Sequence, residues 1–336
     1  MDWQITDLVE ALPDGAVVID MAGAVISANK LAADILQQDL IGLASTSVIR
    51  SPAFAGSLNG VRQSGRAASV DIEFHGRPSR QVSAFLAPLG SSGDILVVLR
   101  DLTREQAIEK MRSDFVANAS HEMRTPLASI IGTIETLQGA AKDDAKARGM
   151  FLATMLQQGQ RMKRLIDDLL TLSRIELNEH VRPDGRVALL NVLKQAKANL
   201  SQQALETKVI IELKADAELM VAGNADELLQ VAQNLLENAI KYGADGGRIE
   251  INCSTRGSHA VFAVKDFGKG IAEIHLPRLT ERFYRVSTQE SRQRGGTGLG
   301  LAIVKHILLR HRGKLDIVSA PGHGSTFTVS IPLHNS

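Results

Sequence analysis

The alternation of apolar and polar positions changes character twice along the chain, which divides it into three parts. Residues 1–103 carry short runs in which apolar and polar side chains alternate, separated by Gly, Ser and Asn turn signals. Runs of this kind predict β-strands. We expect a small α+β domain, with strands at 15–20, 24–29, 68–76, 80–89 and 94–102 and a helix at 29–38.

A helical period replaces the alternation from about residue 104. Apolar residues recur every three or four positions in 104–138 and again in 145–177, which predicts two amphipathic helices. Between them, residues 138–144 supply a glycine turn and Asp144, a good helix N-cap. The stripes consist of Val116, Met123, Leu127, Ile130, Ile134 and Leu137 in the first helix and of Phe151, Met155, Met162, Leu165, Leu169 and Leu172 in the second.

A helical hairpin of this kind leaves much of its apolar stripe uncovered when it stands alone. Two copies that pack together bury both stripes in a four-helix bundle. We therefore expect residues 104–178 to form a homodimer.

Helices and strands alternate in residues 179–336, which predicts an α/β sandwich. The turn signal Pro-Asp-Gly at 183–185 lies near its start. The expected helices cover 188–204, 224–243 and 300–313, and the expected strands cover 208–215, 248–255, 260–268, 314–320 and 325–333.

Composition narrows the class of protein without fixing a function. A chain of 336 residues has room for three domains, and its net charge of +1 provides no strong field for nucleic acid or membranes. The single cysteine, Cys253, excludes an internal disulfide and a cysteine-based metal cluster. Asp20 interrupts the longest apolar stretch, so we expect no membrane span, while anchoring by a partner or an upstream segment stays open.

The stretch SHEMRTP (120–126) places a histidine beside the stripe of the first predicted helix. A helical zinc pair needs a second histidine four residues after His121, and that position holds Thr125, so a zinc site is excluded. Glu122 is an acceptor for an imidazole proton, which makes the other ring nitrogen more nucleophilic. Pro126 lacks the N–H that would bond to the Glu122 carbonyl, so we expect a bend there. The plain alternative is a solvated surface histidine.

Four stretches of the last part carry residues suited to a nucleotide. In NLLENAIKY (234–242), two asparagines four residues apart share a helix face and offer amide oxygens to Mg²⁺. DFGKGI (266–271) places an acid at the end of a strand, and RGGTGLGL (294–301) exposes backbone N–H groups before a helix. GHGSTF (322–327) is a tight turn entering a strand. Each alone fits a surface helix or an ordinary turn, but their order and placement together favour a nucleotide site.

This arrangement resembles the ATP-binding domain of sensor histidine kinases of two-component systems, which belongs to the GHKL or Bergerat type. The four stretches match the N box and the three glycine boxes of that family, and ERFYRV (281–286) is similar to its F box. SHEMRTP matches the phosphoacceptor H box, and RLIDDLLTLSRIE (164–176) matches the second helix of the same domain. Residues 1–103 look like a PAS sensor domain that ends in the linking motif DLT (101–103).

The resemblance implies three domains: a PAS domain at 1–103, a dimerisation and phosphotransfer domain (HisKA) at 104–178, and an ATP-binding domain (HATPase) at 179–336. GTIETL (132–137) and SRIELNEH (173–180) look most similar to phosphate-regulon sensor kinases. Phosphate signalling and a cytoplasmic location are implied, although such kinases usually carry membrane helices before the PAS domain.

The resemblance also implies roles for individual residues. His121 becomes the phosphorylated residue, with Glu122 as general base and Thr125 holding the water for dephosphorylation. Asn238, with Asn234 near it, holds Mg²⁺. The implied nucleotide contacts are Lys241 and Arg285 to phosphates, Tyr242 packing nearby, Asp266 to adenine in a pocket shaped by Gly268 and Gly270, a lid of Thr297, Gly298, Leu299, Gly300 and Leu301 seated by Phe283, and Thr326.

The implied activity is Mg-ATP-dependent autophosphorylation on His121, transfer to an aspartate of a separate response regulator, and phosphatase activity toward that regulator. Two alternatives stay open: an ATP-driven clamp, which uses a Glu base where this chain has Asn234, and a scaffold that binds regulators without catalysis. The PAS domain is expected to be a ligand-free interaction module. Cys253 lies too far along the chain for a flavin adduct, and His75 is the only histidine before residue 104.

Overall fold

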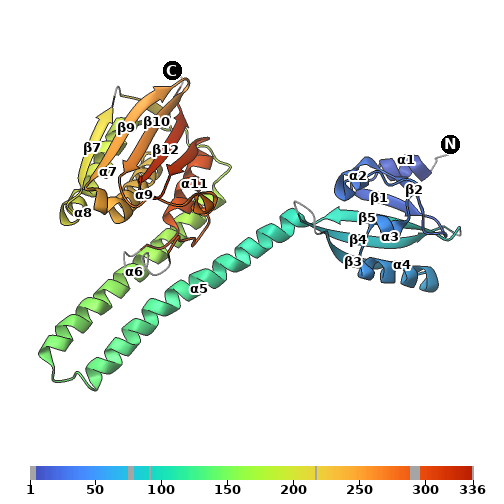
Figure 1. The fold of residues 1–336 in the computed structure, drawn as a ribbon, viewed down its shortest axis with the longest axis horizontal. Helices are drawn as coiled ribbons and strands as arrows, with labels where there is room; N and C mark the ends of the chain where they lie inside the picture. Colours follow the sequence, from blue (N-terminus) through green and yellow to red (C-terminus); the bar gives the residue numbers. More distant parts are fainter. Residues whose placement is uncertain (1–4, 75–78, 91, 216–217, 288–295, 335–336) are drawn as a thin grey trace. The chain divides into compact units, whose positions relative to one another are not determined.

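The computed structural model describes residues 5–74, 79–90, 92–215, 218–287 and 296–334 (Figure 1). It divides into two compact units, Met1–Val116 and Ala117–Ser336, which are described separately below.

The first unit is built on a five-stranded antiparallel sheet in the order β2-β1-β5-β4-β3. All five predicted strands are present, and the described part of the one expected at 68–76 ends at Phe74. The strands are β1 (Gly15–Ile19), β2 (Val25–Ala28), β3 (Ala68–Phe74), β4 (Arg80–Leu89) and β5 (Asp94–Asp101), and the helices are α1 (Ile5–Glu10), α2 (Lys30–Leu36), α3 (Ser45–Val48) and α4 (Pro52–Ser64).

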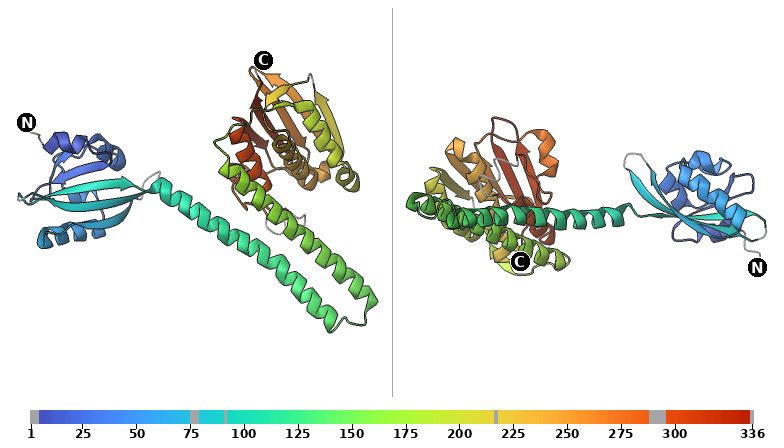
Figure 2. Two further views of the ribbon diagram at one scale, coloured as in Figure 1. Left: turned by 180° about the vertical axis from the view of Figure 1, so that it is seen from behind. Right: turned by 90° about the horizontal axis from the view of Figure 1, so that it is seen from below.

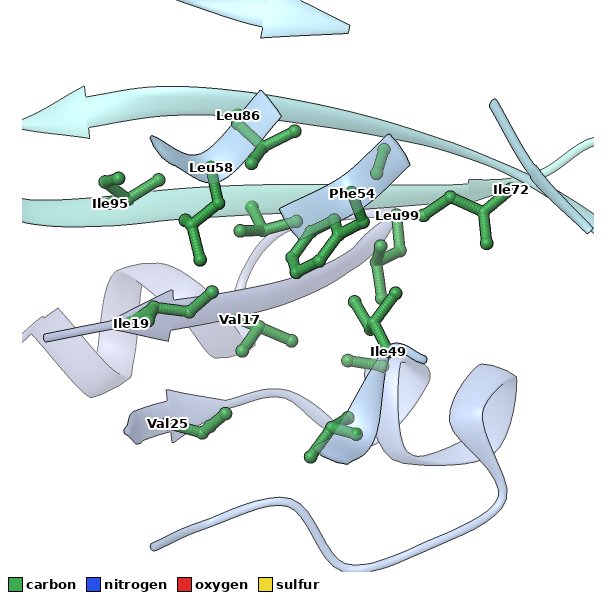
Figure 3. Packing of buried hydrophobic residues seen from close by; sticks show 14 of the residues in the cluster. Val17, Ile19, Val25, Ile49, Phe54, Leu58, Ile72, Leu86, Ile95 and Leu99 are labelled. Atoms are coloured by element: carbon green, nitrogen blue, oxygen red, sulfur yellow. The ribbon is translucent and has the colours of Figure 1, made fainter. Parts of the chain in front are cut away.

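Strand β1 is buried on both faces of this sheet, which explains its unbroken apolar sequence. Val17 and Ile19 enter the main core, while Ala16 and Val18 pack with Val9 of α1 on the other side. Alternate side chains of a strand point to opposite faces, so one strand serves two cores. Figure 3 shows the main core, in which Phe54 and Leu58 of α4 lie over the sheet residues.

Helix α4 has no counterpart among the predicted elements. Ser51 caps it by accepting a hydrogen bond from the Phe54 N–H at 3.3 Å, and Pro52 occupies its first turn. Phe54, Leu58 and Val61 are buried at helical spacing. The Ser-Pro start and this spacing were the available signals, but the small residues between them hide the pattern.

The second unit contains a helical hairpin formed by α5 (Thr103–Gln138), which begins in the first unit, and α6 (Ala145–Leu177). Asp144 caps α6, as predicted, and accepts hydrogen bonds from the N–H groups of Lys146 and Ala147 at 2.9 Å each. Helix α5 continues through Pro126 without interruption.

The predicted apolar stripes are only partly covered within the single chain. Leu165 and Leu172 of α6 are buried, whereas Leu127 of α5 is 45% exposed and Ile134 is 37% exposed. These values fit a stripe that one hairpin cannot cover by itself, so the homodimer remains a prediction.

The rest of this unit is a two-layer α/β structure. Its five-stranded sheet has the order β11-β12-β10-β9-β7, in which only the β7–β9 pair is parallel. Figures 1 and 2 show α7, α9 and α11 covering one face of this sheet. The strands are β6 (Arg186–Ala188), β7 (Ile210–Ala215), β8 (Met220–Ala222), β9 (Arg248–Arg256), β10 (His259–Asp266), β11 (Lys314–Ser319) and β12 (Ser325–Pro332), and the helices are α7 (Leu189–Asn199), α8 (Ser201–Glu206), α9 (Ala225–Gly243) and α11 (Gly300–Arg310).

Two details differ from the predicted elements. The helix expected at 188–204 is divided at Leu200 into α7 and α8. The short antiparallel pair β6–β8 was not predicted, because three-residue strands carry too little alternation to be read from sequence.

Candidate functional site

A cavity of about 350 Å³ lies beside α9, and most of the predicted nucleotide residues line it. Its walls come from α9, the end of β10, the segment before α11 and one face of α6. Ligand sites in proteins typically have this size and a few convergent polar groups. The predicted residues that line the cavity are Asn234, Asn238, Lys241, Tyr242, Asp266, Gly270, Arg285, Thr297, Gly298, Gly300 and Leu301.

Helix α9 presents one polar face to the cavity. Asn234, Asn238 and Lys241 recur at helical spacing, while the opposite face of α9 is buried in the core. The Nδ2 atom of Asn234 is buried and has no hydrogen-bond partner among the described residues. Lys241 forms an ion pair with Glu237 at 2.9 Å, and both side chains border the cavity.

These residues fit a Mg²⁺ ion that is carried by a nucleotide. Amide oxygens of Asn234 and Asn238 are hard ligands, and the orphaned Nδ2 of Asn234 is a donor for a phosphate oxygen. The described part of the chain contains no group of three His, Cys, Asp or Glu residues arranged to hold a metal. Phosphate oxygens and water would therefore have to complete the coordination.

Asp266 ends β10 and is 4% exposed at the cavity wall. Its Oδ1 atom accepts hydrogen bonds from the N–H groups of Gly268 and Ser325 at 3.0 and 3.2 Å. Burial raises the pKa of the Asp266 carboxyl above its usual value, although these hydrogen bonds act in the opposite direction. A buried acceptor at this position suits the amino group of a flat, aromatic ligand such as adenine.

Gly270 is required where the chain passes close to its neighbour. It adopts a φ of +68°, and a Cβ atom there would lie 1.9 Å from the Ala320 carbonyl oxygen. No larger residue fits without moving the backbone. Gly268 does not line the cavity, but a Cβ there would meet the Tyr242 carbonyl oxygen at 2.4 Å, so it also permits this close approach.

The glycine segment before α11 is described from Gly296 onward, so the first two residues of RGGTGLGL lie outside the described residues. The N–H of Phe283 donates to the Gly298 carbonyl at 2.8 Å, and both residues have positive φ values, +62° and +76°. This main-chain bond joins the predicted F box to the glycine segment. It orders the segment at the mouth of the cavity.

Besides Gly268, two predicted nucleotide-contact residues do not line the cavity. Leu299 is fully buried beneath the glycine segment, so it packs in the core. Thr326 lies on β12 between Ser325 and Phe327, which do line the cavity, and the alternation of the strand turns Thr326 to the other face. The structure thus places neither side chain on the cavity surface.

His121 is exposed on α5, as predicted, and the hydroxyl of Thr125 donates to its carbonyl at 3.3 Å. Glu122 forms ion pairs with Arg161 of α6 at 2.9 Å and with Arg285 at 3.0 Å. Arg285 is buried, lines the cavity and also donates to the Thr297 carbonyl at 2.7 Å. The neighbour of His121 is thus connected to the cavity through one guanidinium group.

Sequence analysis missed the contribution of α6 to this site. Arg161, Arg164 and Asp168 lie on one helix face at spacings of three and four; Arg164 and Asp168 line the cavity, and Arg161 holds Glu122. The polar spacing within RLIDDLL was the only signal in the sequence, and an ordinary solvated helix face has the same pattern.

The pKa of the Asp168 carboxyl is raised in this wall of the cavity. Burial raises the pKa of its carboxyl, and the nearby Glu237 acts in the same direction. The hydroxyl of Thr297, which donates to Asp168 at 2.7 Å, lowers the same pKa, as do Lys241 and Arg164.

Among the described residues, no helix combines the length and the apolar character that crossing a bilayer requires.

Two family models match the chain. Residues 111–178 match the His Kinase A (phospho-acceptor) domain, and residues 223–335 match the histidine kinase-, DNA gyrase B- and HSP90-like ATPase. The first match contains the predicted H box, and the second contains the cavity residues of α9, β10 and α11.

Curated relatives of high similarity are sensor kinases. The chain is 43% identical over 233 residues to the phosphate regulon sensor protein PhoR of Pseudomonas aeruginosa, which covers 69% of this chain and 53% of that protein. It is 39% identical over 229 residues to the sensor histidine kinase RppB of Synechocystis sp., covering 67% and 50%. The chain spans about half the length of the curated relatives it matches.

Solved structures agree with the fold. The histidine kinase AdeS of Acinetobacter baumannii aligns with a TM-score of 0.52 at 25% identity, covering 64% of this chain and 98% of that one. The histidine kinase ThkA, solved in complex with the response regulator protein TrrA, aligns with a TM-score of 0.50 at 16% identity, covering 97% and 98%. The chain matches both the phosphoacceptor domain and the ATPase domain, and the relatives described above are sensor kinases. The chain therefore belongs to the sensor histidine kinase family.

Proposed function

We propose that this chain is a protein-histidine kinase that transfers the γ-phosphoryl group of Mg-ATP to its own His121. The observation that carries the proposal is the connection from Glu122, the residue directly after His121, to Arg285 in the wall of the cavity. A phosphoacceptor and a nucleotide cavity that share one pair of charged residues are arranged for transfer between them.

The cavity residues then divide the work of binding. Asp266 accepts from the adenine amino group, Lys241 and the backbone of Gly298 and Gly300 contact phosphates, and Tyr242 packs beside the nucleotide. Asn238 and Asn234 would hold Mg²⁺, which when bound would neutralise charge on the phosphates. Positioning and charge neutralisation supply most of the acceleration in phosphoryl transfer.

The chemical step forms a bond between an imidazole nitrogen of His121 and the γ-phosphorus, and it breaks the bond from that phosphorus to the bridging oxygen. ADP leaves with that oxygen. Glu122 acts as the base for the imidazole proton, and Arg285, already beside Glu122 and the cavity, stabilises negative charge on the transferring group.

The phosphoryl group then passes to an aspartate of a separate response regulator, and Thr125 orients the water for the reverse, phosphatase reaction. The complex of ThkA with its regulator supports this class of partner. The exposed stripe residues Leu127 and Ile134 of α5 and the exposed apolar side chains of α6 outside its predicted stripe, such as Leu156 and Leu170, support a homodimer. The 43% identity to a phosphate regulon sensor supports phosphate signalling. We place this activity in the cytoplasm.

Residues 1–103 are proposed to be a PAS-type sensor domain, followed by a phosphotransfer domain to residue 178 and an ATP-binding domain from 179. The antiparallel sheet with helices packed on both faces supports a compact sensor module. Haem is not expected in this module, because His75 is the only histidine before residue 104. His75 lies outside the described residues.

The test is incorporation of label from γ-labelled Mg-ATP into the purified chain. We expect a label that acid removes and base preserves, absent from His121→Ala and retained in His180→Ala, which alters a second exposed histidine. Release of free phosphate without labelling would instead identify an ATP-driven clamp. A chain that binds no ATP would be a scaffold.

A further inference from the structure

A side chain outside the ATP-binding domain holds its glycine segment. Asp168 of α6 accepts a hydrogen bond from the Thr297 hydroxyl at 2.7 Å. Thr297 lies directly before Gly298, at the point where the chain turns into α11. The contact therefore joins the helical hairpin to the segment that is proposed to contact phosphates.

Thr297 is held from a second side by the same hairpin. Its carbonyl accepts from Arg285 at 2.7 Å, and Arg285 is paired with Glu122, which is paired in turn with Arg161. The Thr297 hydroxyl is thus bonded to α6 directly, and the Thr297 carbonyl is connected to α5 through Arg285. Two independent attachments fix the orientation of a segment, where a single one would leave it free to rotate.

The chemistry of Asp168 argues against an incidental contact. A carboxylate in the wall of a cavity for an anionic ligand is unfavourable, both because it is buried and because it repels phosphate. Burial and Glu237 raise the pKa of Asp168, so its environment already opposes the charge. Asparagine or glutamine could accept a hydrogen bond there without that cost, but a carboxylate accepts a stronger one.

We propose that Asp168 is a positioning residue for phosphoryl transfer, which holds Thr297 so that the glycine segment presents the γ-phosphate toward the helical hairpin. This inference rests on the proposed kinase activity. Without the bond, the cavity still binds ATP through α9 and Asp266, but the reacting phosphorus is held less well. Misplacement of reacting groups by about 1 Å costs up to roughly 100-fold in rate.

The test measures initial rates of His121 labelling against ATP concentration with the full chain. We expect Asp168→Ala and Thr297→Val each to lower kcat about tenfold while KM for ATP changes less than about threefold, because transition-state positioning is lost and ground-state binding is kept. Thr297→Ser keeps the hydroxyl and should retain nearly the full rate. Asp167→Ala, which removes the exposed neighbouring acid, is the matched control.

The double variant Asp168→Ala/Thr297→Val separates a direct bond from two unrelated effects. We expect it to be no slower than the slower single variant, because both substitutions remove the same interaction. Rates that multiply would overturn the proposal, as would an unchanged kcat or a faster reaction in Asp168→Ala, or a loss confined to KM. If Asp168→Ala does not fold, the Thr297→Val and Thr297→Ser pair decides the matter alone. A wild-type chain that takes up no label would contradict the kinase activity itself.

Discussion

Two buried polar side chains, Asn29 in the first unit and Asp266 in the second, show how the same kind of residue serves two purposes. Each sits at the end of a strand or the start of a helix, and each is at most 4% exposed. The Asn29 amide bonds only to the fold around it: it donates to the carbonyls of Val9, Leu12 and Asp14 and accepts from the N–H groups of Ala16 and Ala32.

Asp266 differs from Asn29 because the hydrogen bonds that it accepts do not fully offset the cost of burying its charge. It accepts from Gly268 and Ser325, yet its environment raises the pKa of its carboxyl, and it borders an open cavity. A polar group whose partners all belong to the fold stabilises that fold. A buried charged group whose pKa is shifted and that borders a cavity is suited to binding a ligand. Four predictions test this distinction.

Asn29→Ala should produce the largest loss of stability. It leaves two backbone N–H groups without their acceptor, and unsatisfied buried groups cost about 1–3 kcal/mol each, so we expect a loss of ~3 kcal/mol. Denaturant unfolding followed by a probe in the first unit measures it. Asn59→Ala changes an exposed asparagine of the same unit and should leave stability nearly unchanged. A reduced ATP affinity in Asn29→Ala would contradict a purely structural role.

Asp266→Ala should lower the affinity for ATP about 30-fold, which corresponds to ~2 kcal/mol, because a buried hydrogen-bond acceptor for the base is lost. Calorimetric titration with Mg-ATP measures the change. Asp316→Ala removes an exposed acid of the same sheet and provides the comparison. Equal affinities for the two variants would place the adenine elsewhere.

Asp266→Asn should raise the free energy of unfolding of the second unit at pH 7, because it removes a charge that burial disfavours, while it weakens ATP binding. Since the folded-state pKa of Asp266 lies above its unfolded value, the ionised carboxylate destabilises the fold. This disadvantage fades as the pH falls through the folded-state pKa toward the unfolded value of 3.8. Unfolding curves of both proteins between pH 7 and pH 4 should therefore converge, and parallel curves would refute the assignment.

The smallest effect concerns His311, which is fully buried and accepts a hydrogen bond from the Asn224 N–H at 3.1 Å. Burial lowers the pKa of His311 in the folded state below 6.5, so stability is complete above that unfolded value. It is lost as the pH falls from about 6.5 toward the folded-state pKa.

His311→Gln should flatten this part of the pH profile, whereas His180→Gln, at an exposed position, should not. Unfolding measured from pH 7.5 to pH 5 provides the test. Because burial also lowers the pKa of His306, we expect the slope to be reduced rather than abolished, and an unchanged slope would contradict the prediction.

The sequence predicted where helices and strands lie better than it predicted which face of a strand lines the cavity. Periodicity located the strands of the first unit and both long helices, and Asp144 was identified as a cap because capping depends on residues adjacent in sequence. Thr326 was assigned to the site although Ser325 and Phe327 line the cavity, since which face of a strand is buried depends on its neighbours in the sheet.

The cavity residues of α9 were predictable because one helix brings them together. Asp168 and Arg161 were not, because they reach the site only through packing between different elements: the Asp168–Thr297 bond joins residues 129 apart in the sequence, and the Arg161–Glu122 pair joins residues 39 apart. Helix periodicity and capping describe residues that are close in the sequence, so they carry no information on such contacts. These contacts are found only in the three-dimensional structure.

The bond between the Phe283 N–H and the Gly298 carbonyl has a consequence for protein engineering. Because it is made of main-chain atoms, a mutant library that randomises the side chains around the cavity leaves it untouched. Only replacements at its own two positions attack it, above all β-branched residues, which tolerate positive φ poorly. Nucleotide specificity could therefore be altered widely at this cavity while the entrance keeps its shape.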